Sequence, residues 1–104
     1  MLEISTGKVV RVIALTREYG PDSVSLSDYI SGLNDDEKAN LVALMWIGRG
    51  SFEAEELEYA KAEARREASA PTESYLSGIP GLAEHLESGM EALGIDVTGA
   101  EDEL

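Results

Sequence analysis

The sequence contains no cysteine, so disulfide bonds and zinc sites built on thiolates are excluded. Its single histidine, His85, has neither a cysteine nor a second histidine with which to share a metal ion. The apolar run 41–47 is far shorter than the roughly 20 residues that cross a bilayer. The first residues lack the basic and apolar regions of a signal peptide. We therefore expect a cytoplasmic protein with no membrane span, no metal ion and no other cofactor.

Basic residues are also few. Eight lysines and arginines stand against 21 aspartates and glutamates, which gives a formal net charge of −13. Such a charge repels the phosphates of nucleic acids and anionic membrane surfaces, so direct binding to either is not expected. The simplest interpretation of the acidic surface is that it keeps the protein in solution. The functional alternatives are a positively charged protein partner and mimicry of a nucleic acid.

The length of the chain limits its organisation. With 104 residues, of which 43% are hydrophobic, it can bury one modest core and is too short for a second domain. Helical patterns run through residues 1–94, whereas the last residues are rich in acidic side chains. We predict a single helical domain over 1–94 and an acidic flexible tail over 95–104.

The stretch 34–50 predicts the central helix. Asn34 can accept a hydrogen bond from the first helical turn, and Glu37 can bond back to it, which makes a capping box. The acidic residues of this turn also suit the positive end of the helix dipole. Because no polar residue interrupts 41–47, this helix has no solvent face and should be covered on most sides. Gly48 and the glycine two residues later provide conformations that end a helix.

The segment before it admits two interpretations. Ser5 or Thr6 can cap a helix that runs to about Tyr19, with its valines on one stripe. The same residues are rich in β-branched side chains, so 9–15 could also form a strand. We prefer the helix, and we expect its valines to lie on the core or on a partner chain, because packing must stabilise such a helix. The valine-rich face is also the predicted interface of a homodimer.

The remaining helices are predicted from the spacing of apolar residues and from the residues that start or end a helix. One helix is predicted from Leu26 with Ser25 as its cap, and another over 52–68, where glutamates precede basic residues and small alanines face inward. A short helix over 72–78 and a last one ending near Leu93 complete the pattern. The predicted fold is an all-α, compact bundle of about five helices around the central one.

Three segments carry a resemblance to a known family. They are the heptapeptide Leu-Met-Trp-Ile-Gly-Arg-Gly at 44–50, the tetrapeptide Tyr-Leu-Ser-Gly at 75–78, and the helix from Leu82 to Gly94. Together they resemble a small bacterial family known only as a domain of unknown function, over roughly Leu26 to Gly94. The resemblance implies a compact helical bacterial domain, and it brings no activity, cofactor or catalytic residue.

Four residues are candidates for contact with a ligand or partner: Arg49, Trp46, His85 and Tyr75. Arg49, held between two glycines, can present its guanidinium to a carboxylate or phosphate; alternatively it bonds the last carbonyls of the central helix or pairs with a nearby acid. His85 is interpreted as a structural histidine or a pH-sensitive contact. Trp46 is interpreted as a core residue, and Tyr75 as a ring that is buried while its hydroxyl stays in water.

The sequence does not favour an enzyme. It contains no nucleophile elbow of a serine hydrolase and no phosphate-binding glycine loop. The leading hypothesis is a non-catalytic interaction or regulatory module, homodimeric through Val9 and Val12. One alternative is a protein or minor enzyme that binds a small anionic molecule through Arg49. The other is an acidic nucleic-acid mimic that binds a basic protein.

Overall fold

The computed structural model describes residues 1–67 and 71–95. These residues form six α-helices and one short 3₁₀ helix and contain no strand, so the all-α prediction is confirmed with one helix more than the expected five. The elements in chain order are α1 (Thr6–Tyr19), α2 (Val24–Ser31), α3 (Asp35–Gly48), the 3₁₀ helix η1 (Ala54–Glu56), α4 (Leu57–Arg66), α5 (Thr72–Ser77) and α6 (Leu82–Ala92).

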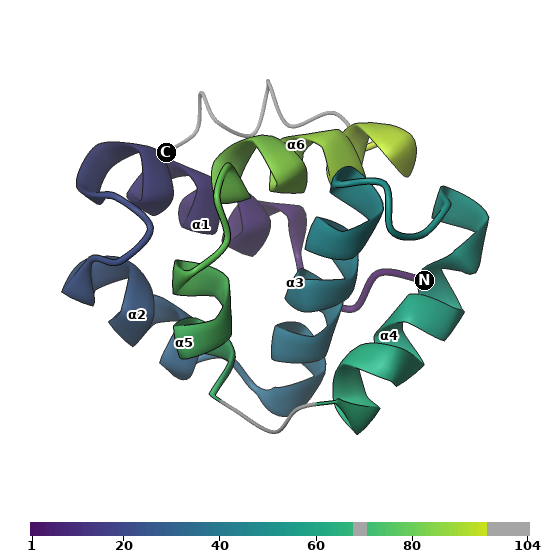
Figure 1. Ribbon diagram of the computed structural model, residues 1–104, viewed down its shortest axis with the longest axis horizontal. Coiled ribbons are helices and arrows are strands. Elements are labelled where there is room, and N and C mark those ends of the chain that lie inside the picture. Colours follow the sequence, from purple (N-terminus) through teal and green to yellow (C-terminus); the bar gives the residue numbers. More distant parts are fainter. Residues whose placement is uncertain (68–70, 96–104) are drawn as a thin grey trace.

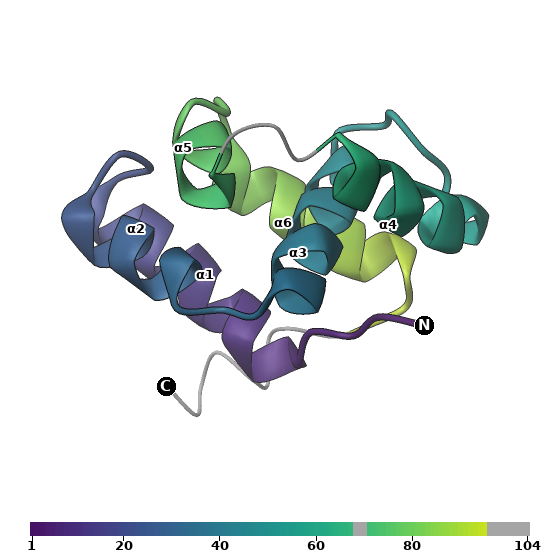
Figure 2. The same ribbon diagram turned by 90° about the horizontal axis from the view of Figure 1, so that it is seen from below.

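Helix α3 lies at the centre of the molecule. It packs mainly against α4 and α6, while α1 packs against α6 and α2, and α5 packs against α2. In Figure 1, α4 and α5 lie on opposite sides of α3; in Figure 2, α1 and α2 lie together on the side of α3 away from α4. In the part of the chain that is described, no helix combines the length and apolar character needed to cross a bilayer.

The start of α3 follows the predicted capping box. The Asn34 side chain accepts a hydrogen bond from the Glu37 N–H at 2.8 Å, and the Glu37 carboxylate accepts one from the Asn34 N–H at 3.0 Å. Every residue of the apolar run 41–47 is buried. The capping box therefore predicted where this helix starts, and the apolar run predicted that it is buried.

The first element is a helix, α1, and not a strand. Ser5 is its N-cap and accepts a hydrogen bond from the backbone of Lys8 at 3.2 Å. Val9, Val12 and Ile13 are 0% exposed, which confirms that this face packs on the core. The two valines are already covered by the chain's own helices, so a homodimer cannot use them without opening the fold.

Several helix boundaries differ from the prediction. Helix α2 is capped by Ser23 and not by Ser25, because the Ser23 hydroxyl accepts from the Leu26 N–H at 3.2 Å. The predicted helix over 52–68 begins instead as η1, and α4 ends at Arg66. Helix α6 begins after Gly81, which has a φ of 70°, and ends at Ala92, next to the predicted Leu93.

Gly48 has a different role from the predicted one. It is a helical residue, and Gly50, with φ of 90°, follows the end of the helix. A Cβ on Gly48 would overlap the His85 carbonyl of α6, and a Cβ on Gly89 would overlap the Leu44 carbonyl of α3. These two glycines therefore allow the backbones of α3 and α6 to touch where they cross.

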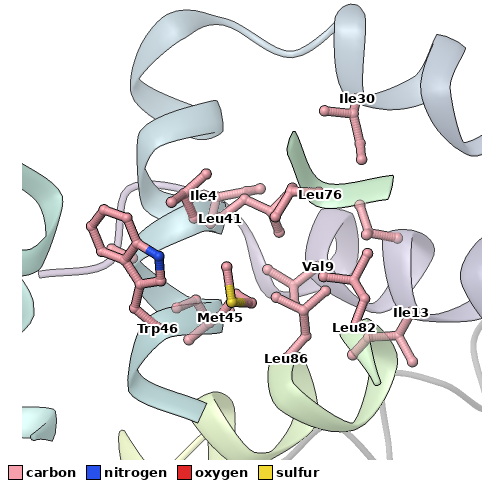
Figure 3. Packing of buried hydrophobic residues seen from close by; sticks show 14 of the residues in the cluster. Ile4, Val9, Ile13, Ile30, Leu41, Met45, Trp46, Leu76, Leu82 and Leu86 are labelled. Carbon is pink, nitrogen blue, oxygen red and sulfur yellow. The ribbon is translucent and has the colours of Figure 1, made fainter. Parts of the chain in front are cut away.

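The core forms one cluster, of which Figure 3 shows a part. Its members come from most helices and from Ile4 before α1. In Figure 3, Trp46 lies at the edge of the group opposite Ile13. Ile95 also packs on the core, and its N–H donates to the Met90 carbonyl at 2.8 Å. The packed region thus extends one residue into the predicted tail, and the remainder of that tail lies outside the described residues.

Candidate functional site

Four aromatic side chains form a continuous strip across α5, α3, the following loop and α4. The indole N–H of Trp46 donates to the Tyr75 hydroxyl at 2.9 Å. The Phe52 ring lies 5.7 Å from the Trp46 ring and 5.7 Å from the Tyr59 ring, measured between centroids. Trp46 is 8% exposed, whereas Tyr75 and Tyr59 are 37% and 59% exposed. This aromatic strip is anchored in the core at its middle and reaches the surface at both ends.

Trp46 lies on a face of α3 that its neighbours leave slightly exposed. Ala39, Val42 and Trp46 are 7–8% exposed, whereas Leu44 and Met45 are 0% exposed. The spacing of three and then four residues places the first group along a single helical face. Ala39 and Val42 line a pocket together with residues of α4 and α5, so this part of the face lies between those two helices.

Acidic residues precede Tyr59 in the chain. Glu53, Glu55 and Glu56 are exposed, and the Glu53 N–H donates to the Glu56 carboxylate at 2.8 Å, which starts η1. These three glutamates therefore face the solvent. Among residues 1–67 and 71–95, no group of three or more His, Asp and Glu side chains is placed to hold a metal ion.

Arg49 lies at the end of α3, three residues after Trp46, and is exposed. Its Nε donates to the Ser51 hydroxyl at 3.0 Å. Within the described residues its guanidinium forms no ion pair and no bond to a carbonyl of α3. Neither of the two structural roles considered for Arg49 is therefore observed, and its remaining N–H groups are available to a ligand.

His85 does not join the aromatic strip. Its backbone carbonyl faces Gly48 at the crossing of α3 and α6. Its imidazole lies beside Gly81 at the start of α6 and is half-buried. Of the four predicted contact residues, the structure brings Trp46 and Tyr75 together and places Arg49 on the next loop, while the His85 ring lies beside Gly81 and makes no hydrogen bond or ring contact with the other three within the described residues.

Lys61 is a buried charge that the sequence analysis missed. Its side chain is 4% exposed, and its ammonium donates to the Met1 carbonyl at 2.5 Å and lies 2.8 Å from the Glu3 carboxylate and 3.1 Å from Glu58. Arg65 also lies 3.3 Å from Glu3. Hydrogen bonds from Lys61 and Arg65 lower the pKa of Glu3 to about 2.

Asn40 completes this network. It is 0% exposed, accepts a hydrogen bond from the Glu3 N–H at 2.7 Å and donates to the Asp36 carbonyl at 2.7 Å. The first residues of the chain are thereby fastened to both α3 and α4. Because its charged groups are already paired, we interpret this network as structural and not as a ligand site.

Two of the pockets formed by the described residues bear on the ligand hypothesis. The larger, of about 400 Å³, lies among α3, α4 and α5. Its lining consists of Asp35, Asp36, Lys38, Ala39, Val42, Ala64, Arg65 and Thr72. The smaller, of about 190 Å³, is lined by residues of α1, α6 and the turns before α2 and α6. None of the four predicted contact residues lines either pocket, so these pockets do not support a ligand site shared by Arg49 and His85.

Comparison with known proteins adds a family assignment. The model of one family, described as a protein of unknown function (DUF3775), matches residues 23–95. The matched span includes α2 to α6, while α1 lies before it. Searches of curated proteins and of solved structures gave no match. The resemblance noted over roughly Leu26 to Gly94 is thus confirmed, and the chain belongs to the DUF3775 family of proteins of unknown function.

Proposed function

We propose that this protein is a non-catalytic, cytoplasmic interaction module that binds a positively charged segment of a partner protein along the aromatic strip. The observation that carries the proposal is that the strip, anchored by Trp46, reaches the surface at Tyr75 and Tyr59. The exposed tyrosines offer apolar area together with hydroxyl groups, a combination enriched in protein interfaces.

The core also supports the exposed rings of the strip. Tyr59 packs on Phe52 and Phe52 packs on the buried Trp46, so the exposed rings are held by the core. A binding surface that is already ordered loses little conformational entropy when a partner binds. More than half of the Tyr59 side chain is exposed, so the fold itself does not require most of this ring.

Charge selects the type of partner. The net charge of −13 attracts basic proteins over long distances, and the exposed glutamates that precede Tyr59 in the chain supply short-range partners for lysine and arginine. A lysine or arginine placed over a tyrosine ring also gains cation–π attraction. A protein whose basic groove binds nucleic acid would fit the same surface, as the mimicry hypothesis requires.

A small anion bound at Arg49 is the second candidate function. The supporting observation is the exposed guanidinium, which forms no ion pair in the described parts of the chain despite the many acidic residues. A carboxylate could accept two of its N–H groups side by side. The glutamates that follow Arg49 weaken this candidate, because they repel an approaching anion.

Selection of peptides from a random displayed library tests the first proposal. We expect the selected peptides to be rich in lysine and arginine and to bind Tyr59→Ser at least about tenfold more weakly, as expected for loss of an interface aromatic. Tyr19→Ser is the matched control, because Tyr19 is 55% exposed but lies outside the strip, and it should bind as the wild type does. Affinity should also fall when the salt concentration rises from about 50 to about 300 mM. Selected peptides without positive charge, or equal binding to both variants, would contradict the proposal.

A further inference from the structure

The pocket among α3, α4 and α5 has features of a small-molecule site, separate from the aromatic strip. Its volume of about 400 Å³ lies within the range of ligand pockets in proteins. Ala39 and Val42 of α3 and Ala64 of α4 contribute its apolar side chains, and each is 7% exposed. These three side chains can cover a short aliphatic group.

The charged residues at this pocket are of two kinds. Asp36 and Arg65 pair with each other at 2.8 Å, so their charges are already matched. Asp35 and Lys38 also line the pocket, but in the part of the chain that the structure describes their side chains form neither an ion pair nor a hydrogen bond. Among the described residues, the Asp35 carboxylate and the Lys38 ammonium therefore have no partner, and both lie beside an apolar surface.

We propose that this pocket binds a small zwitterion, an α-amino acid with an aliphatic side chain. Lys38 receives its carboxylate, Asp35 receives its ammonium group, and the aliphatic side chain covers the surface formed by Ala39 and Val42. Residues three apart on a helix have their Cβ atoms about 5–6 Å apart, which suits a ligand whose two charges lie on adjacent carbon atoms. A ligand with only one charge would form one ion pair fewer, so it should bind more weakly.

Titration of the full chain with L-leucine, followed by NMR amide shifts, tests this proposal. We expect saturable shifts at residues 35–42 and 64–65 with a dissociation constant below about 1 mM. Isoamylamine and 4-methylpentanoate, which each lack one charge of leucine, should bind at least about tenfold more weakly. Lys38→Met and Asp35→Asn should each weaken leucine binding by a similar factor.

Arg11→Met is the matched control, because Arg11 is exposed on α1 and lies outside the pocket. It should leave leucine binding unchanged, and circular dichroism should show that all three variants are folded. The proposal is overturned by the absence of saturable shifts with L-leucine, L-valine and L-methionine up to about 10 mM. It is equally overturned if isoamylamine binds as tightly as leucine or if folded Lys38→Met binds normally. The pocket residues do not belong to the aromatic strip. Absence of amino-acid binding would therefore overturn this inference without contradicting the proposed interaction module.

Discussion

Replacing Gly48 with alanine should destabilise the protein by about 3 kcal/mol or more, which is a large part of the stability of a domain of this size. The added Cβ would overlap the His85 carbonyl and approach the backbone nitrogen of Gly89. Both obstacles are backbone atoms of α6, so no side-chain rotation can relieve the overlap and α6 must move away from α3. Urea unfolding followed by circular dichroism measures the loss.

Gly7→Ala is the matched control for this prediction. Gly7 is also a helical residue, but a Cβ at this position would meet nothing within 4 Å. Because alanine reduces the conformational freedom of the unfolded chain, we expect Gly7→Ala to stabilise the protein by about 0.4–1 kcal/mol. The same substitution should therefore change stability in opposite directions at the two sites. Equal effects at Gly7 and Gly48 would show that the crossing of α3 and α6 is less close than described.

Trp46→Ala should cost about 3–5 kcal/mol, as is usual when a large aromatic side chain is removed from a core. Trp46 is 8% exposed, packs against Phe52 and donates its indole N–H to Tyr75. The substitution removes all of these contacts together. Thermal or urea unfolding followed by circular dichroism measures the effect, because Trp46 is the only tryptophan and the variant loses its fluorescence signal.

Tyr75→Phe separates the hydrogen bond from the packing. It keeps the ring of Tyr75 and removes only the hydroxyl that accepts from Trp46, so we expect a cost of about 1 kcal/mol. If Tyr75→Phe and Trp46→Ala have the same cost, packing of the indole contributes little and Trp46 does not anchor the strip. Because Trp46→Ala should destabilise the fold, a loss of binding in that variant could not be assigned to the interface. Binding is therefore tested at Tyr59.

The sequence predicted those parts of the fold that depend on neighbours along the chain. The capping box of Asn34 and Glu37 lies within one helical turn, and the burial of α3 follows from its uninterrupted apolar run. The strand alternative for α1 was removed only by the structure, since β-branched residues fit either element until the packing is known. The shift of the α2 cap from Ser25 to Ser23 shows how neighbouring serines offer competing starts.

Other features depend on contacts between distant residues. A glycine that ends a helix and a glycine that lets another helix approach look the same in a sequence, so the role of Gly48 was missed. Lys61 is buried because Met1 and Glu3, about 60 residues earlier in the chain, bind its ammonium. The pattern of apolar residues within α4 cannot show that Lys61 is buried.

The candidate site was predicted in part. Trp46 and Tyr75 were both selected, but their hydrogen bond depends on how α5 packs beside α3. Phe52 and Tyr59 were not among the four selected residues, and nothing in their spacing shows that their rings continue the strip. His85 was selected because it is the only histidine, and rarity in composition does not determine where a ring lies.

The most direct test of the proposed interaction module is photo-crosslinking in the protein's native cells, with benzoylphenylalanine replacing Tyr59 in one variant and Tyr19 in the other. The two tyrosines are similarly exposed, at 59% and 55%, but only Tyr59 belongs to the aromatic strip. We predict discrete adducts with positively charged proteins from position 59 that are absent from position 19. Identical adducts from both positions, or none from position 59, would contradict the account.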